Sequence, residues 1–518
     1  MSVKNSAEMT PDDDEVYRPK RGSKSEEKEE LFQNALAVVS GKIFLTRNKS
    51  REMYATFLEE AGYVETVAVN APRFASVIRR LVRVGLKIRP SKALVEELVE
   101  ELREDADSGT LECHEVHNRV ALGARGQYFI DLCNGKGEVI EVDALGCRLH
   151  DGETEMPLFL RKQGMTALPN PIGQPARLEL LRKYLNLGSD AQWRLVVVFL
   201  LYSHRPNGPY VILVIFGSAG SSKSTFCRTV RSLIDPSSVP TQSVPKSIAD
   251  LMITASNSHL QAFDNVRELS DEMSDAFCRL ATGGGARTRA LYTNGEETLF
   301  HVTKPCLLNG IHGVATQPDL LSRCIHLELP AITVRRTEEE FNRSLEGDIA
   351  SIFAGLMEAL SKTLAALPDI TEVPETRMAD FSRFGMAVER ALGWPQDSFR
   401  QAYEQNQAEQ MWNTLADDPL ALAVKALVSD DRADEDDEGE GDEVEKTNTY
   451  TPTKLLAALD RIATREQRLS KAWPKSPLSL GKRLRNMEPA LRACGVGVEA
   501  AHSGNRTFTL RRLAGFKP

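Results

Sequence analysis

Residues 211–225 have the sequence VILVIFGSAGSSKST, and this stretch decides the fold class. Its first six residues are all apolar, as expected of a parallel strand that is buried on both faces. Gly217 and Gly220 then allow a tight turn whose N–H groups point inward, and a helix predicted from Phe226 to Leu233 presents its positive end to the same point. The stretch therefore predicts a phosphate-binding loop between a central strand and a helix.

The loop is expected to bind ATP together with Mg²⁺. Lys223 follows the glycines at the spacing that reaches the β- and γ-phosphates, and the hydroxyl of Ser224 is placed to bind the magnesium ion. Ser222 stands where the usual motif has its last glycine, so the backbone loses freedom for left-handed angles there. The alternative is a chance Gly- and Ser-rich turn that contains a lysine. The predicted nucleotide-binding residues are Gly217, Ser218, Ala219, Gly220, Ser221, Ser222, Lys223, Ser224 and Thr225.

A second strand is expected over residues 260–263, and Asp264 ends it. A carboxylate in this place holds magnesium in phosphate-loop ATPases, whereas an isolated aspartate would be an ordinary residue at a strand end. The next residue is Asn265, where many related ATPases have the glutamate that polarises the attacking water. An amide orients a water but cannot take its proton, so Glu268 is the candidate substitute.

Two further candidates belong to the next two strands. Asn309 ends the strand predicted over 305–308, where its amide is expected beside the γ-phosphate; a turn-forming asparagine is the alternative. Arg323 precedes a strand predicted over 325–329 and is expected to reach a neighbouring subunit's nucleotide; a surface salt bridge is the alternative. The predicted catalytic residues are Lys223, Asp264, Asn265, Asn309 and Arg323, and Ser224 and Asp264 are the predicted Mg²⁺ ligands.

A glycine-rich turn at residues 283–285 leads into Arg287 and Arg289. Asn294-Gly295 follows and is a strong hairpin signal. A hairpin with two arginines is suited to hold a nucleic-acid phosphate backbone, although solvated arginines on a loop are common. Arg287 and Arg289 are therefore predicted DNA-binding residues.

The composition fits a soluble chain of several domains. Its 518 residues are 42% hydrophobic and 26% charged, and eight scattered cysteines include no Cys-x-x-Cys pair. The N-terminus has no apolar core typical of a signal peptide, and the apolar runs at 195–202 and 211–216 are far shorter than the roughly twenty residues a membrane helix needs. We therefore expect a cytoplasmic protein with reduced cysteines and no membrane partner.

The net charge of −9 conceals an uneven distribution. Residues 430–446 hold eleven acidic side chains and two basic ones, as in an extended linker. From residue 447 to 518 there are fourteen Lys or Arg against four Asp or Glu. A basic C-terminal module behind an acidic spacer is suited to bind DNA, with a solvated basic surface as the alternative.

The pattern in this C-terminal module is helix, helix, and then two short strands near 496–498 and 507–510. Helices followed by a two-stranded wing predict a winged-helix domain. Basic side chains cluster on its last helix and wing, where they would contact duplex DNA phosphates. The predicted DNA-binding residues here are Lys475, Lys482, Arg483, Arg485 and Arg506.

The predicted fold class is α/β: a P-loop AAA+ ATPase core with an N-terminal α+β domain and a C-terminal winged-helix domain. Helical periodicity is assigned to residues 29–107, and short strands with glycine-containing turns to residues 110–142. The predicted parts are a disordered tail (1–28), the N-terminal domain (29–175), the ATPase core (176–345), a helical extension (346–427), an acidic linker (428–447) and the winged-helix domain (448–518).

The order of these motifs resembles the ATPase core of phage- and plasmid-type primase–helicases, which are superfamily 3 helicases of the AAA+ class. Among them it is most similar to the ATP-binding replication proteins of bacterial mobile elements, and the Trp-Pro-Lys-Ser-Pro sequence at 473–477 also resembles their C-terminal module. The resemblance implies a ring, a homo-hexamer, with nucleotide between subunits and single-stranded DNA in the channel. It does not extend to priming, because residues 29–175 show no paired acidic motif.

The leading hypothesis is an ATP-dependent DNA helicase or translocase for replication of a phage, plasmid or integrated mobile element. The alternative is an ATP-gated DNA-binding initiator or regulator that does not unwind, which Asn265 favours. A third hypothesis is an ATPase of a mobile-element defence system that acts on a protein partner, and the basic C-terminus counts against it.

Overall fold

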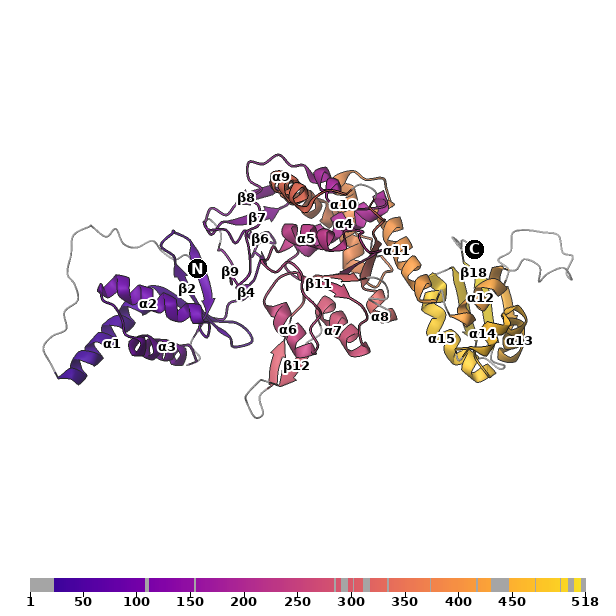
Figure 1. Ribbon diagram of the computed structural model, residues 1–518, viewed down its shortest axis with the longest axis horizontal. Coiled ribbons are helices and arrows are strands. Elements are labelled where there is room, and N and C mark those ends of the chain that lie inside the picture. Colours follow the sequence, from indigo (N-terminus) through magenta and orange to yellow (C-terminus); the bar gives the residue numbers. More distant parts are fainter. Residues whose placement is uncertain are drawn as a thin grey trace.

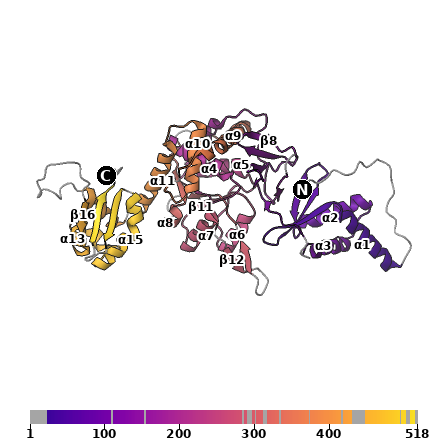
Figure 2. The same ribbon diagram turned by 180° about the vertical axis from the view of Figure 1, so that it is seen from behind.

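The computed structural model describes residues 23–107, 111–152, 155–283, 286–289, 297–300, 302–310, 317–332, 335–372, 374–415, 418–429, 447–470, 472–493, 495–501 and 507–513. The expected tail falls mostly outside these residues, although the first helix already begins at Lys24. The acidic run 430–446 also lies outside them. Figure 1 shows an N-terminal part, a large central body and a C-terminal module along the long axis, and Figure 2 shows the same parts from behind.

The N-terminal part packs three helices against an antiparallel sheet of order β1-β2-β3. The prediction of helices throughout residues 29–107 is wrong for 43–68, where β-branched and aromatic side chains such as Thr46, Tyr54 and Thr56 form strands. The part has its own core, centred on Phe74 and Ile78 of α2. Its elements are α1 (Lys24–Ser40), β1 (Ile43–Arg47), β2 (Met53–Leu58), β3 (Val64–Ala68), α2 (Pro72–Leu86) and α3 (Lys92–Asp107).

The next strands form an antiparallel sheet of order β5-β6-β7-β8. This sheet does not share the core of the N-terminal part. Val120, Ile130 and Ile140 instead belong to the core of the central body, and Asp143 O accepts a 2.6 Å hydrogen bond from Ser361 Oγ there. Residues 29–175 were predicted as one domain, but they contribute to two separate cores: the three helices and β1–β3 form the core of the N-terminal part, and the β5–β8 sheet joins the core of the central body. The strands of this sheet are β5 (Val120–Leu122), β6 (Tyr128–Asp131), β7 (Val139–Asp143) and β8 (Gly146–Leu149), and β4 (Val116–His117) and β9 (Leu158–Phe159) form a separate parallel pair.

The central body contains a four-stranded parallel sheet of order β11-β14-β10-β15. The apolar run at 211–216 forms its inner strand β10, and helices cover both faces (Figure 1). The strands are β10 (Ile212–Phe216), β11 (Gln261–Val266), β14 (Cys306–Gly310) and β15 (Cys324–Glu328). The helices are η1 (Leu178–Lys183), α4 (Asp190–Ser203), α5 (Lys223–Ile234), α6 (Ile248–Ser256), α7 (Asp271–Thr282) and α8 (Pro318–Leu321).

A buried ion pair fastens the phosphate-loop helix α5 to the preceding sheet. Arg119 donates from Nε to Asp235 Oδ1 over 2.9 Å, and both side chains are at most 1% exposed. Burial alone would raise the pKa of Asp235, but the Arg119 guanidinium holds it below its ordinary value. Asp235 Oδ2 also accepts the backbone N–H groups of His259 and Leu260, so the loop before β11 is fixed to the same carboxylate.

Three long helices follow the sheet: α9 (Glu338–Ala366, continued by η2, Leu367–Asp369), α10 (Ala379–Leu392) and α11 (Ser398–Leu415). By length and composition alone, 338–369 could cross a membrane, although the sequence runs suggested no such segment. This is weak evidence because a core helix passes the same test, and 61% of its most apolar window is buried inside the protein.

α11 connects the central sheet to the C-terminal module. The side-chain amide of Asn406 bonds both backbone groups of His326 in β15, at 3.0 Å and 2.6 Å, and the Gln407 amide donates to Cys324 O. The edge of β15 is therefore paired with amide side chains where a further strand would otherwise pair. α11 also packs against α15 of the C-terminal module.

The C-terminal module is a three-stranded antiparallel sheet of order β16-β18-β17 with helices on one side. Trp473 lies in its core and donates from Nε1 to Asp460 over 2.9 Å. α12, predicted as part of the helical extension, contributes Leu420 and Val424 to this core instead. The elements are α12 (Pro419–Ser429), β16 (Thr447–Tyr450), α13 (Pro452–Ile462), α14 (Arg465–Leu469), α15 (Pro477–Ala493), β17 (Val496–Ala501) and β18 (Thr507–Arg512).

Candidate functional site

The turn after β10 needs glycine because the next strand crowds it. Gly217 has a φ of 147°, and an added Cβ would lie 2.7 Å from the carbonyl oxygen of Leu329, closer than real Cβ atoms approach. The N–H of Leu329 donates to Phe216 O over 2.8 Å, so the end of β15 holds the start of the loop. Gly220 also has a left-handed φ, of 82°.

Ser222 adopts the left-handed conformation that the usual glycine would adopt more easily. Its φ is 66° and its ψ is 27°, and it precedes the first residue of α5 without any capping bond from its side chain. A non-glycine residue in this conformation costs about 1–2 kcal/mol. The serine therefore does not change the path of the loop, but it leaves local strain there.

Lys223 is held by the loop itself. Its ammonium donates to Gly217 O over 2.8 Å and to Ser218 O over 3.0 Å. Ser218, Ala219, Gly220 and Ser224 are exposed, whereas Ser222, Lys223 and Thr225 are half-buried. Ser221 is fully buried, and its hydroxyl has no hydrogen-bond partner among the described residues.

Asp264 and Asn309 lie close together, near the carboxyl ends of the parallel strands β11 and β14. β14 lies between β10 and β11, and Asn309 stands opposite Ile215, next to the start of the loop. Asn309 Nδ2 donates to Asp264 Oδ1 over 2.6 Å, and the N–H of Asn265 donates to the same oxygen over 2.7 Å. Asn309 is 1% exposed, and its Oδ1 has no partner in the described part of the chain.

Asn265 is exposed and is the second non-glycine residue of the site in the left-handed region, with a φ of 56°. Asparagine tolerates this conformation better than most residues do. β11 continues past Asp264 to Val266, and its pairing with β14 shifts register between Phe263 and Val266. Glu268 is exposed beyond the end of this strand.

Arg323 is turned toward its own chain. Its guanidinium binds the Asp319 carboxylate at 2.7 Å, and only 9% of its side chain is exposed. Arg377 reaches the same carboxylate at 3.4 Å. Contact between Arg323 and a neighbouring subunit would require this ion pair to open.

Two residues that border the loop were not predicted from the sequence. An added Cβ on Gly220 would lie 3.5 Å from Nη2 of Arg335, so this guanidinium reaches the loop. Asn186 donates from Nδ2 to Ser221 O and to Pro330 O, at 3.2 Å and 2.6 Å. Both residues are far from the motif in sequence, and no spacing rule marks them.

The expected arginine hairpin is present in the backbone as β12 (Ala286–Arg289) and β13 (Glu297–Phe300). In the register, Arg287 lies opposite Leu299 and Arg289 lies opposite Glu297. The turn between the strands and the side chains of Arg287 and Arg289 lie outside the described residues. Figure 1 shows β12 pointing away from the central body, below α6 and α7.

The basic residues of the C-terminal module differ in their surroundings. Lys482 and Arg485 of α15 are exposed, and Lys475 donates to Arg468 O over 2.9 Å. Arg483 instead forms an ion pair with Asp418, which ties α15 to the start of α12. Arg506 lies outside the described residues. Lys482 and Arg485 are therefore the better-placed candidates for phosphate contacts.

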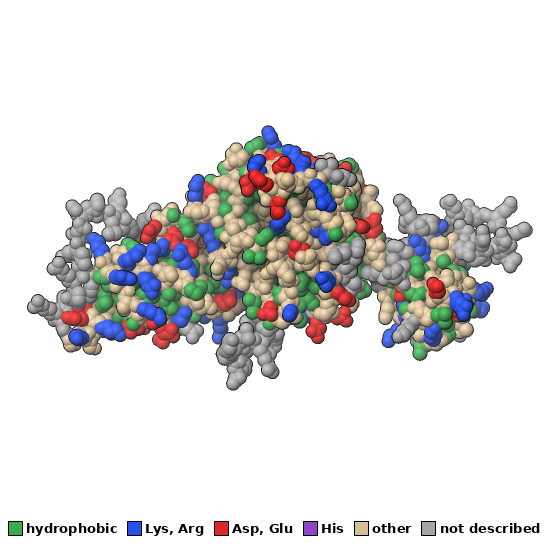
Figure 3. Space-filling model, in the orientation of Figure 1, with side chains coloured by type: hydrophobic (Ala, Val, Ile, Leu, Met, Phe, Trp, Pro, Cys, Tyr) green, Lys and Arg blue, Asp and Glu red, His purple; other side chains and the backbone are tan. Residues whose placement is uncertain are grey.

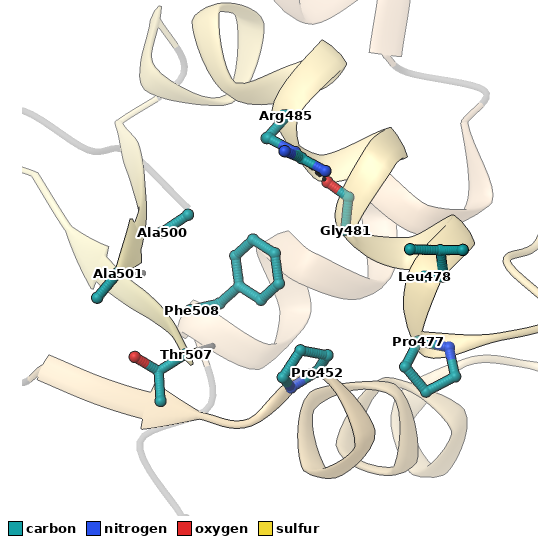
Figure 4. Close-up of a pocket in the computed structure, with 9 residues that line it drawn as sticks. All are labelled: Pro452, Pro477, Leu478, Gly481, Arg485, Ala500, Ala501, Thr507 and Phe508. Atoms are coloured by element: carbon teal, nitrogen blue, oxygen red, sulfur yellow. Dashed lines mark hydrogen bonds between the residues drawn. The ribbon is translucent and has the colours of Figure 1, made fainter. Parts of the chain in front are cut away.

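A small apolar pocket adjoins Arg485. Figure 4 shows Phe508 of β18 pointing toward α15, with Leu478 at the start of that helix and Gly481 one turn before Arg485. The Nε of Arg485 donates to Gly481 O over 3.0 Å, and Leu478 is 74% exposed. A basic group thus lies at the edge of a small apolar pocket that the exposed Leu478 borders.

Two family models match the chain. Residues 178–407 match the model described as actinomycete integrative conjugative element replication protein, and residues 420–517 match the AICE RepA C-terminal domain. Together these matches span well over half of the sequence. No curated protein matches it.

Solved structures give more distant likenesses. The chain is similar to the active helicase Cch of SCCmec type IV at 10% identity, covering 91% of this chain and 93% of that chain with a TM-score of 0.42. It is similar to the apo C-terminal region of NrS-1 at 10% identity, covering 93% of this chain and 98% of that chain with a TM-score of 0.40. At these values the likenesses carry no argument about the site.

The family matches define the class first: the chain is a replication protein of a mobile genetic element, as its resemblance implied. More particularly, it belongs to the replication proteins of actinomycete integrative conjugative elements.

The left-handed angle of Ser222 gives a testable prediction. Ser222→Gly should be tolerated, whereas Ser222→Val should destabilise the loop by about 1–3 kcal/mol because a β-branched residue is strained at this angle. Thermal unfolding measures both effects. Ser218→Val is the matched control, since Ser218 is exposed and its φ is not positive. Equal losses in the two valine variants would contradict the prediction.

Proposed function

We propose that the protein is an ATP-dependent DNA helicase or translocase that serves replication of its mobile element. Its core is a P-loop ATPase of the AAA+ class, and its C-terminal module is a winged-helix DNA-binding domain. The observation that carries the proposal is the Asp264–Asn309 hydrogen bond on the strands next to the Lys223 loop. A carboxylate, an amide and an ammonium at one sheet edge are the groups that bind and cleave a triphosphate.

The residues present suit ATP and Mg²⁺. Gly217 and Gly220 give the backbone its positive φ angles, and α5 points its N-terminus at the loop, where an anion is favoured. Buried polar atoms without partners are rare, and Asn309 Oδ1 is one that a water beside the nucleotide would satisfy. Mg²⁺ bound with ATP supplies charge neutralisation at the β- and γ-phosphate oxygens.

Each residue has a separate role in this proposal. Lys223 would leave the two loop carbonyls that it now contacts and bind the β- and γ-phosphates, and Ser224 and Asp264 would hold the metal. Asp264 Oδ1 already accepts two hydrogen bonds, which fix the carboxylate, so its other oxygen would be available to a cation. The Asn309 amide would lie beside the γ-phosphate, Asn265 would orient the attacking water, and Glu268 would take its proton because Asn265 cannot.

We propose a homo-hexameric ring that acts in the cytoplasm without a membrane partner. Arg323 would leave Asp319 when a neighbouring subunit presents its nucleotide, and would stabilise the charge that develops on the γ-phosphate. The β12–β13 hairpin would place Arg287 and Arg289 at single-stranded DNA in the channel. Arg335 completes the site from within its own chain, since it reaches the loop.

The topology of the C-terminal module supports a winged helix. The order β16-β18-β17 places the last two strands as a hairpin after three helices, and α15 lies just before it in the chain. A helix with exposed basic side chains, followed by a hairpin, docks in a groove of duplex DNA and contacts its phosphates. Lys475, Lys482 and Arg485 are the described residues proposed for these contacts.

A second candidate function is an ATP-gated initiator or regulator that binds DNA without unwinding it. Asn265 favours this candidate, because the residue that follows the metal-binding aspartate carries no carboxylate. ATP would then hold the assembled state, and slow cleavage would release it.

Lys223→Ala tests the proposal. We expect ATP hydrolysis that is stimulated by single-stranded DNA, together with strand displacement, and we expect the variant to lose both by at least about a hundredfold because its ammonium no longer binds the phosphates. Nucleotide binding without turnover would favour the initiator. ATP hydrolysis that is indifferent to DNA would exclude both functions and favour an ATPase that acts on a protein partner.

The C-terminal module gives an independent prediction. Replacing Lys482 and Arg485 by alanine should weaken duplex binding uniformly across sequences, and the slope of log K against log[salt] should become shallower by about 1 for each cation removed from a phosphate. Arg483→Ala should instead lower the unfolding temperature, because Asp418 loses its partner. Fluorescence anisotropy titrations and thermal unfolding measure the two effects. The prediction is wrong if Arg483→Ala flattens the salt dependence and the double variant does not.

A further inference from the structure

The segment around the second helix of the N-terminal part, α2, concentrates positive charge. Residues 66–95 contain seven Lys or Arg and no Asp or Glu. Arg79 and Arg83 of α2 and Arg89 just beyond its end are exposed, and we call these three residues the α2 basic face. In Figure 3, Lys and Arg side chains gather over the part of the surface where Figure 1 places α2.

Other cations of this segment are already neutralised. Arg73 and Arg80 form ion pairs with Glu59, and Lys92 pairs with Glu96. In contrast, Arg79, Arg83 and Arg89 have no carboxylate partner among the residues that the structure describes. Some cations of this segment are therefore engaged in ion pairs within the N-terminal part, whereas Arg79, Arg83 and Arg89 face the solvent.

The acidic residues of the same part lie on other elements. Glu26, Glu27, Glu29 and Glu30 belong to α1, and α3 carries Glu96, Glu97, Glu100, Glu101 and Glu104. A surface that serves only solubility intersperses both signs, whereas a one-sided field attracts a partner of opposite charge. The segregation thus points to an anionic partner at α2.

The geometry narrows the class of partner. Arg79 and Arg83 lie one helical turn apart on the same side of α2, and Arg89 follows just beyond the end of the helix at Leu86. Val84, which is 54% exposed, directly follows Arg83 in the chain. Cations spaced in this way suit the regularly spaced phosphates of a nucleic-acid backbone better than a single anionic group.

We propose that the α2 basic face binds the phosphate backbone of DNA, as a contact separate from the C-terminal module. We expect the contact to be independent of base sequence, because cations that bind phosphates fix the position of the protein on the duplex without reading its bases. It rests on the proposed function only in taking DNA as the substrate. Neither the nucleotide site nor α15 is needed for it.

The test uses the full chain without nucleotide and a fluorescein-labelled duplex of random sequence, titrated at several KCl concentrations. The variant carries Arg79→Gln, Arg83→Gln and Arg89→Gln. A matched control removes three exposed charges from α9 and α10, with Lys362→Gln, Arg343→Gln and Arg390→Gln. Thermal unfolding accompanies every variant.

The α2 variant should bind the duplex at least about tenfold more weakly in low salt, and its salt slope should become shallower by about 0.9 for each phosphate that is no longer neutralised. The control should leave both quantities unchanged. Because the measurement contains no ATP, loss of hydrolysis would not alter this result.

Three outcomes would overturn the proposal. One is an α2 variant that binds like the wild type. Another is a control that weakens binding equally, since the effect would then be net charge alone. The third is a lower unfolding temperature with an unchanged salt slope, which would mean that the cations only stabilise the C-terminal end of α2.

Discussion

The parallel pairing of β10 with β14 on one side and β15 on the other is the constraint on which the candidate site depends. Ile215 stands opposite both Asn309 and Leu327, so the ends of three strands are fixed at one edge of the sheet. The loop that holds Lys223 begins there, and β11 adds Asp264 from the far side of β14. Burial of β10 on both faces makes a slip of this register costly, because it would displace apolar side chains that are almost entirely buried.

Two residues that depart from the usual ATPase motif share one backbone feature. Ser222 and Asn265 both have positive φ angles, at the start of α5 and at the register shift of β11. The surrounding structure holds each of them there: α5 begins directly after Ser222, and the N–H of Asn265 is bonded to Asp264. Strain of this kind persists only where neighbouring elements impose it, and it concentrates at functional sites.

The sequence predicted the central strand and the loop because an apolar run and glycines mark them locally. It also singled out Asp264 and Asn309, although their strands do not end there but continue to Val266 and Gly310. It did not predict β1–β3, whose short alternating segments lie between strongly periodic helices. Three further features depend on contacts between residues that are far apart in the sequence or on the packing of whole elements. Arg323 turns toward Asp319, Arg335 reaches the loop from another segment, and α12 joins the C-terminal core, none of which is marked by spacing.

The most direct test of the account is the magnesium dependence of nucleotide binding at Asp264. Calorimetry should compare the wild type with Asp264→Asn, which keeps the oxygen that accepts from Asn309 and Asn265. With a non-hydrolysable ATP analogue, we predict that Mg²⁺ tightens binding to the wild type by about tenfold or more, equivalent to at least about 1.4 kcal/mol, and leaves the variant unchanged. An equal gain from Mg²⁺ in both proteins would contradict the account, because the metal would then be bound without this carboxylate.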